Sequence, residues 1–98
     1  MSLGDYLAEL LDEAGDIEIP ADREYARDGV TFAARPSDNV IELRLGSEIA
    51  EAARRTPDTG ESPRGDAWVR FAPHSWDEDH AQDRLEAWFR VAWRLAAE

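Results

Sequence analysis

Cysteine and lysine are both missing from this chain of 98 residues. The lack of cysteine excludes disulfides and thiolate metal ligands. The chain also has no long apolar run and no charged-then-apolar leader, so we expect neither a membrane span nor export, and a cytoplasmic location. Its 11 basic residues, all arginine, are outnumbered by 22 acidic ones, for a net charge of −11. Such a charge argues against a protein that coats nucleic acid or anionic membranes, since both are bound mainly through positive charge.

Length and composition predict a single domain spanning residues 1–98. A chain of 98 residues, 43% of them hydrophobic, can close one modest core and is too short for two ordinary domains. We therefore seek one set of helices and strands around one core.

The spacing of apolar residues predicts an α+β fold in the order α-β-β-β-α-β-α. Steps of three and four residues indicate a helix over 3–14, a short helix over 47–55 and a long helix after Ser75. Alternation and turn signals indicate strands over 23–27, 30–35, 40–45 and 67–72, with a surface loop over 56–66. We expect a mainly antiparallel four-stranded sheet with the helices packed on one face.

Strand alternation also predicts an arginine and aromatic face on the sheet. The residues expected to face the helices are Phe32, Ile41, Leu43, Leu45, Val69 and Phe71. Those expected on the opposite face are Arg35, Arg44, Trp68 and Arg70. Arg23, Tyr25 and Arg27 would join them, unless Tyr25 turns inward and reverses that short strand.

Such a face suits an acidic protein segment or a small anion, because guanidinium groups bind carboxylates and phosphates with two parallel hydrogen bonds. The alternative is structural: each arginine pairs with a neighbouring acid, and Trp68 covers its own sheet.

The segment PHSWDEDH, residues 73–80, has the density of acids and histidines expected of a metal site. Ser75 precedes Glu78 by three residues, which is the spacing of a capping box, and the acids would favour the positive end of a helix dipole. The alternative is a metal site, with Asp77, His80 and Asp83 along one helical edge. Helix capping explains the segment without a metal, so we predict no metal ligand here.

From Val30 onward the chain resembles the MmcQ/YjbR-like family of small bacterial proteins. The resemblance covers residues 30–98, about two thirds of the chain, and rests on the segments TFAARP, VIELRL, RGDAWVRF and AWFRVAWRLA. It implies a compact α+β domain with a mainly antiparallel sheet. It also implies DNA binding, the activity with which the family is commonly labelled.

We find no spacing of nucleophile, base and acid that indicates an enzyme, and no cofactor motif. The first hypothesis is a non-enzymatic binding domain, monomeric or homodimeric, for an unknown protein or small anionic ligand. DNA binding is the second hypothesis, and metal binding through residues 74–83 is the third.

Overall fold

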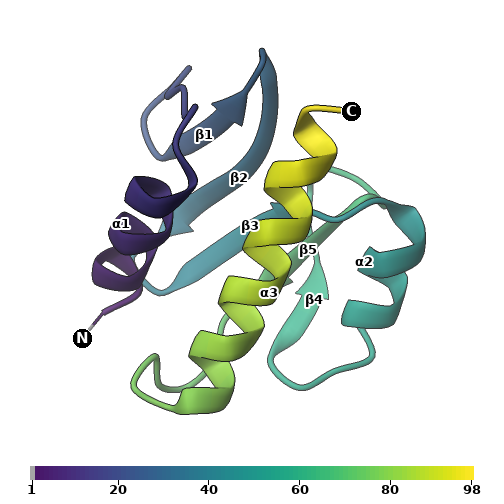
Figure 1. Cartoon of the computed structure of the whole chain (residues 1–98). Helices are drawn as coiled ribbons and strands as arrows, with labels where there is room; N and C mark the ends of the chain where they lie inside the picture. Colours follow the sequence, from purple (N-terminus) through teal and green to yellow (C-terminus); the bar gives the residue numbers. More distant parts are fainter. Residues whose placement is uncertain (1) are drawn as a thin grey trace.

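The computed structural model describes residues 2–98, which form an α+β domain. Its elements, in chain order, are α1 (Leu3–Ala14), β1 (Glu24–Arg27), β2 (Val30–Ser37), β3 (Val40–Arg44), α2 (Ser47–Ala53), β4 (Thr59–Glu61), β5 (Trp68–Phe71) and α3 (Asp79–Ala96). The helices lie on one side of the sheet, with α3 crossing it between α1 and α2 (Figure 1). No helix within residues 2–98 has the length and apolar character needed to cross a membrane.

The sheet has five antiparallel strands in the order β1-β2-β3-β5-β4, so the prediction of four strands is wrong by one. The additional strand, β4, lies within the predicted loop over 56–66 and pairs with β5. β4 contains only Thr59, Gly60 and Glu61, which is too short for alternation to be visible in the sequence. The order of the other elements agrees with the prediction.

The core lies between the sheet and the helices. All six residues predicted to face the helices, at 32, 41, 43, 45, 69 and 71, are at most 1% exposed. From α3, Leu85 and Phe89 are equally buried, and the ring of Phe89 meets Phe32 edge-on at 5.5 Å. The apolar stripe of α3 therefore packs on the sheet face that alternation predicts.

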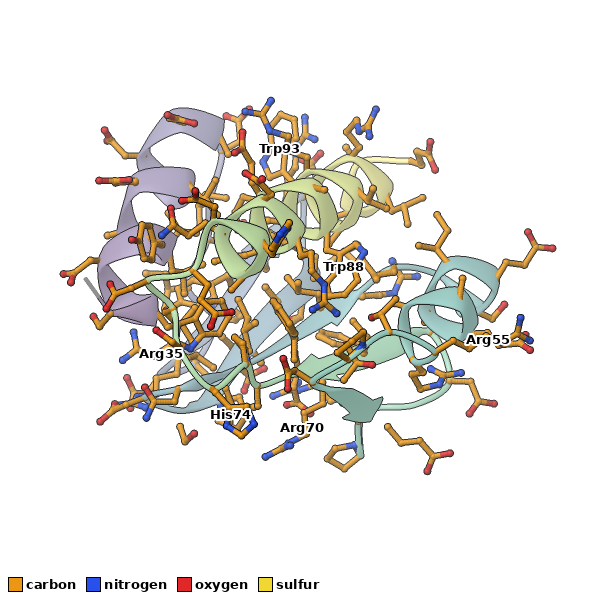
Figure 2. All side chains as sticks on the ribbon, turned by 90° about the horizontal axis from the view of Figure 1, so that it is seen from below. Arg35, Arg55, Arg70, His74, Trp88 and Trp93 are labelled. Atoms are coloured by element: carbon orange, nitrogen blue, oxygen red, sulfur yellow. The ribbon has the colours of Figure 1, made fainter. Side chains whose placement is uncertain are left out.

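A β-bulge in β2 reverses the predicted orientation of Arg35. The register with β1 shifts at Phe32, and both Phe32 and Ala33 enter the core. Two consecutive inward residues invert the alternation of the rest of the strand. Arg35 therefore lies on the helix side, where its Nη1 is 2.9 Å from the position that a Cβ on Gly4 would occupy. Figure 2 shows Arg35 between α1 and the sheet, so its predicted place on the opposite face is wrong.

The same bulge fixes the orientation of β1. Tyr25 pairs with Ala33 and is buried in the core. Of the two orientations expected for β1, the structure therefore has the one in which Tyr25 points inward. Arg27 shares that orientation: its guanidinium stacks 3.5 Å from the ring centre of Trp93, and its Nη1 donates to the Trp93 carbonyl at 3.1 Å. Arg27 therefore joins β1 to α3 and is absent from the opposite face.

The predicted capping box at the start of the last helix is also wrong. α3 begins at Asp79 with Glu78 as its N-cap, and no side chain bonds to this end. Ser75 Oγ instead accepts from the backbone N–H two residues further on, at 3.2 Å. Trp76 is 5% exposed and its Nε1 donates to the carbonyl of Asn39 at 3.2 Å. Burial of this ring holds the segment as a loop against the core, and the helix starts later.

Additional chain lies beside one outer strand of the sheet. The backbone of Glu18 exchanges two hydrogen bonds of 2.8 Å with Ala26 of β1. At the other side, the outermost strand is the three-residue β4. The longer strands β2, β3 and β5 are paired on both sides.

Candidate functional site

The face of the sheet turned away from the helices, here called the outer sheet face, carries the candidate site. The register places on it Glu24, Ala34, Glu42, Arg44, Gly60, Trp68 and Arg70. Arg70 points away from the helix layer, as does His74 beyond the end of β5 (Figure 2). Glu42 lies opposite Arg70 on the neighbouring strand, and Arg44 lies opposite Trp68.

Glu42 is a buried carboxylate, only 3% exposed, at the centre of this face. Its Oε2 accepts from Ser62 Oγ at 2.5 Å, and its Oε1 lies 3.4 Å from Arg64 Nε. Arg64 also reaches Glu24 at 3.5 Å. Ser62 and Arg64 come from the loop between β4 and β5, and they were missed in the sequence because a loop residue has no strand alternation to place it. Both donate hydrogen bonds to the carboxylate that faces Arg70, and Arg64 adds a positive charge beside it.

The same loop covers Trp68. The tryptophan lies on the outer sheet face, as alternation predicts, but it is only 8% exposed. The Arg64 guanidinium is 5.2 Å from the centre of its ring, and Arg54 Nη1 donates to its carbonyl at 3.0 Å. Trp68 therefore covers its own sheet, as the structural alternative predicts, and offers little surface to a ligand.

Arg44 and Arg70 differ from the other arginines of the chain. Within residues 2–98, each of the others donates to a carboxylate, hydroxyl or carbonyl oxygen of the protein. Arg44 and Arg70 make no such bond to the described residues. They occupy diagonal positions on the central strands β3 and β5, with Cα atoms about 7–8 Å apart. The outer sheet face thus presents two adjacent arginines whose side chains make no hydrogen bond or ion pair to the described residues, on a protein of net charge −11.

Arg23 and Arg35 share one acid. Asp38 Oδ1 accepts from Arg23 Nη2 at 2.7 Å and from Arg35 Nη2 at 3.3 Å. The hydrogen bond from Arg23, then that from Arg35, lowers the pKa of Asp38 below its ordinary value of 3.8. These arginines therefore fix the turn between β2 and β3, and both are hydrogen-bonded there, unlike Arg44 and Arg70.

The segment over 73–80 is not assembled into a metal centre. Among residues 2–98, no three histidine or carboxylate side chains lie close enough together to hold a metal ion. The alternative set of Asp77, His80 and Asp83 is thus not brought together. His80 lies exposed near the start of α3.

Comparisons of the chain with known protein families, with curated proteins and with solved structures gave no match. The resemblance of residues 30–98 to the MmcQ/YjbR-like family stays a prediction.

Proposed function

We propose that this protein is a non-enzymatic binding domain that takes an acidic segment of another protein on its outer sheet face, through Arg44 and Arg70. The observation that carries the proposal is that these two arginines lack a partner among the described residues, while acids satisfy so many of the others. Acidic residues outnumber arginines two to one in the whole chain, so the lack of an acidic partner for Arg44 and Arg70 does not come from a general lack of acids.

The geometry of the pair suits carboxylates on an extended chain. Residues i and i+2 of a strand point to the same side about 6.6 Å apart. This separation is close to the spacing of about 7–8 Å between diagonal neighbours such as Arg44 and Arg70. Each guanidinium is able to bind one carboxylate with two parallel hydrogen bonds. A segment with acidic residues at alternate positions therefore matches the pair.

The surroundings favour this ligand in two ways. Gly60, opposite Arg70 on β4, has no side chain to cover it. Glu42 is already bonded to Ser62 and Arg64, so it competes weakly for Arg70. A polyanion such as DNA is disfavoured, because it extends beyond the pair and meets a strongly acidic molecule.

The test is a titration of a fluorescent peptide in which glutamate alternates with threonine. We expect weak, salt-dependent binding by the parent protein. Arg44→Gln with Arg70→Gln should weaken it about tenfold or more, equivalent to about 1.4 kcal/mol or more. The same peptide with glutamine in place of glutamate should not bind.

The matched control is Arg55→Gln with Arg94→Gln, which removes the same charge from two exposed positions, one in the turn just after α2 and one on α3. Arg54 is unsuitable as a control because it supports the backbone of β5 at Trp68. Equal losses in both double variants would show that only net charge matters. Tighter binding of a DNA duplex than of the peptide would favour the DNA hypothesis instead. Thermal melts of every variant separate lost binding from lost folding.

A further inference from the structure

A groove between α1 and α3 lies on the helix side of the molecule, away from the outer sheet face. Two adjoining hollows of about 300 Å³ and 160 Å³ share Leu10 and Glu13 in their lining. The floor is apolar and is made by Leu10, Leu85 and Phe89. Figure 1 shows α1 and α3 on the same side of the sheet, with α3 crossing the centre of the sheet, and the two helices are in contact.

The groove is bounded by a hydrogen bond at each end. At one end, Gln82 Nε2 of α3 donates to Tyr6 Oη of α1 at 2.6 Å. At the other, Trp93 Nε1 donates to the carbonyl of Gly15 at 3.2 Å. The Arg27 guanidinium stacks on the Trp93 ring, 3.5 Å from its centre, and fixes the indole. The two helices are therefore tied together at both ends of the groove.

The rim of the groove is acidic. Glu9 and Glu13 line it from α1, and Glu86 lines it from α3. The basic residue of the lining, Arg90, is bonded to Glu86 at 2.7 Å and so neutralises that one acid. α1 itself carries four acidic residues and no basic one. Glu9 and Glu13 remain without a cation among residues 2–98.

Glu9 and Glu13 are a like-charge pair four residues apart, which destabilises a helix. Such side chains lie about 5–6 Å apart at Cβ, close enough for one guanidinium or ammonium group to contact both. A cation placed there relieves the repulsion and gains two ion pairs. The free protein thus holds an unfavourable arrangement that a basic ligand would turn into a favourable one.

We infer that the groove between α1 and α3 binds a basic segment of a partner protein, with one apolar side chain on the floor and flanking arginine or lysine side chains at the rim. A hollow of about 300 Å³ is at the lower limit for a small-molecule site and suits one or two anchoring side chains. Charge decides between occupants: a second copy of this chain, at net charge −11, is repelled by the rim, as are phosphates and anionic membranes.

The probe is a labelled peptide with one leucine between two pairs of arginines. We expect salt-dependent binding by the parent protein, with a loss of tenfold or more in Glu9→Gln with Glu13→Gln. The same variant should melt at a slightly higher temperature than the parent, because the like-charge pair is gone. Loss of binding combined with a gain in stability is the result that a purely structural role would not produce.

The matched control is Asp12→Asn with Asp16→Asn, which removes the same charge from exposed positions at the same end of the molecule but outside the groove. It should change binding less than twofold. Ala14→Phe, which places a ring in the larger hollow, should weaken binding tenfold or more with the acids intact.

Three results would overturn the inference: no binding by the parent at millimolar peptide, equal losses in the groove and control variants, or undiminished binding of a peptide whose leucine is replaced by serine. Dimerisation of the parent that increases in Glu9→Gln with Glu13→Gln would assign the groove to a second copy instead. Failure of the acidic peptide at Arg44 and Arg70 leaves this test unaffected, since the two sites share no residue.

Discussion

At the scale of single residues, the buried carboxylate of Glu42 depends on its hydrogen bonds for its stability. A carboxylate removed from water is costly unless its oxygens are bonded, and breaking such a cluster leaves an uncompensated buried charge. Ser62 Oγ supplies the shortest bond to it and also accepts the backbone N–H of Arg64 at 3.1 Å. The serine therefore holds both the carboxylate and the loop that covers it.

We predict that Ser62→Ala lowers the free energy of unfolding by about 1–3 kcal/mol, the usual cost of removing one hydrogen bond to a buried charged acceptor. Urea denaturation measures this loss. Ser75→Ala is the comparison, because its hydroxyl bonds only to a backbone N–H of an exposed turn. Its cost should stay below about 0.5 kcal/mol. Equal costs for the two variants would mean that the bond between Ser62 and Glu42 is not stabilising.

At the scale of elements, the stability of the fold depends mainly on α3. This helix contacts β1, β2, β3 and α1. Its buried residues repeat at the spacing of one helical face, ending with Ala92 and Ala96. The alanines let the helix approach the sheet closely, while Leu85 and Phe89 fill the centre of the core.

We predict that Leu85→Ala or Phe89→Ala costs about 2–5 kcal/mol, because each leaves a cavity among residues that are packed on all sides. In a domain of this size such a loss is a large share of the total stability. Ala87→Ser, at an exposed position of the same helix, should cost about 0.5 kcal/mol or less. Urea melts that show losses under about 1 kcal/mol for both core variants would contradict the central role of α3.

What was predictable from the sequence differed between elements for physical reasons. Uninterrupted alternation in β3 and β5 gave the correct orientation for residues 41–45 and 68–71, including the outward positions of Arg44 and Arg70. In β2 a single bulged residue, Phe32, reversed the alternation. Arg35 therefore lies on the helix side of the sheet and not on the opposite face, where alternation predicted it. A bulge depends on how two strands pair, and pairing is not encoded in the spacing of one strand.

The loop and the groove escaped prediction because both depend on tertiary contacts. Arg64 reaches Glu42 across 22 positions of sequence, and no local pattern indicates that contact. The groove arises where two helices distant in the sequence meet over the sheet. Its one signal was the apolar stripe of α1, which continues through Tyr6 and Leu10 beyond the fully buried Leu3 and Leu7.

At the scale of the whole molecule, the charge is both large and unevenly distributed. Arg44 and Arg70, which make no ion pair with the described residues, lie on the outer sheet face, while the helix layer carries the acidic α1 and the rim of the groove. A net charge of −11 on 98 residues makes the folded state repel itself, and this repulsion weakens as salt screens it. The exposed ion pairs weaken too, but each contributes little.

We predict that the melting temperature rises as sodium chloride increases from about 0.02 to 0.5 M, by roughly 4–8 °C if the screened repulsion amounts to about 1 kcal/mol. Calorimetry measures the shift. Asp12→Asn with Asp16→Asn, which removes two negative charges, should show a smaller rise. A fall in melting temperature with salt would mean that ion pairs such as Arg23 with Asp38 outweigh the repulsion.

The way in which the sheet ends has a consequence for self-assembly. Open strand edges are templates for aggregation, since their unpaired backbone groups recruit strands from other chains. Here Glu18 blocks part of β1, and β4 offers only three residues, one of them a glycine. Neither edge supports the long, regular pairing that fibril growth or strand addition requires. We therefore expect the molecule to resist edge-to-edge aggregation even when its charge is screened.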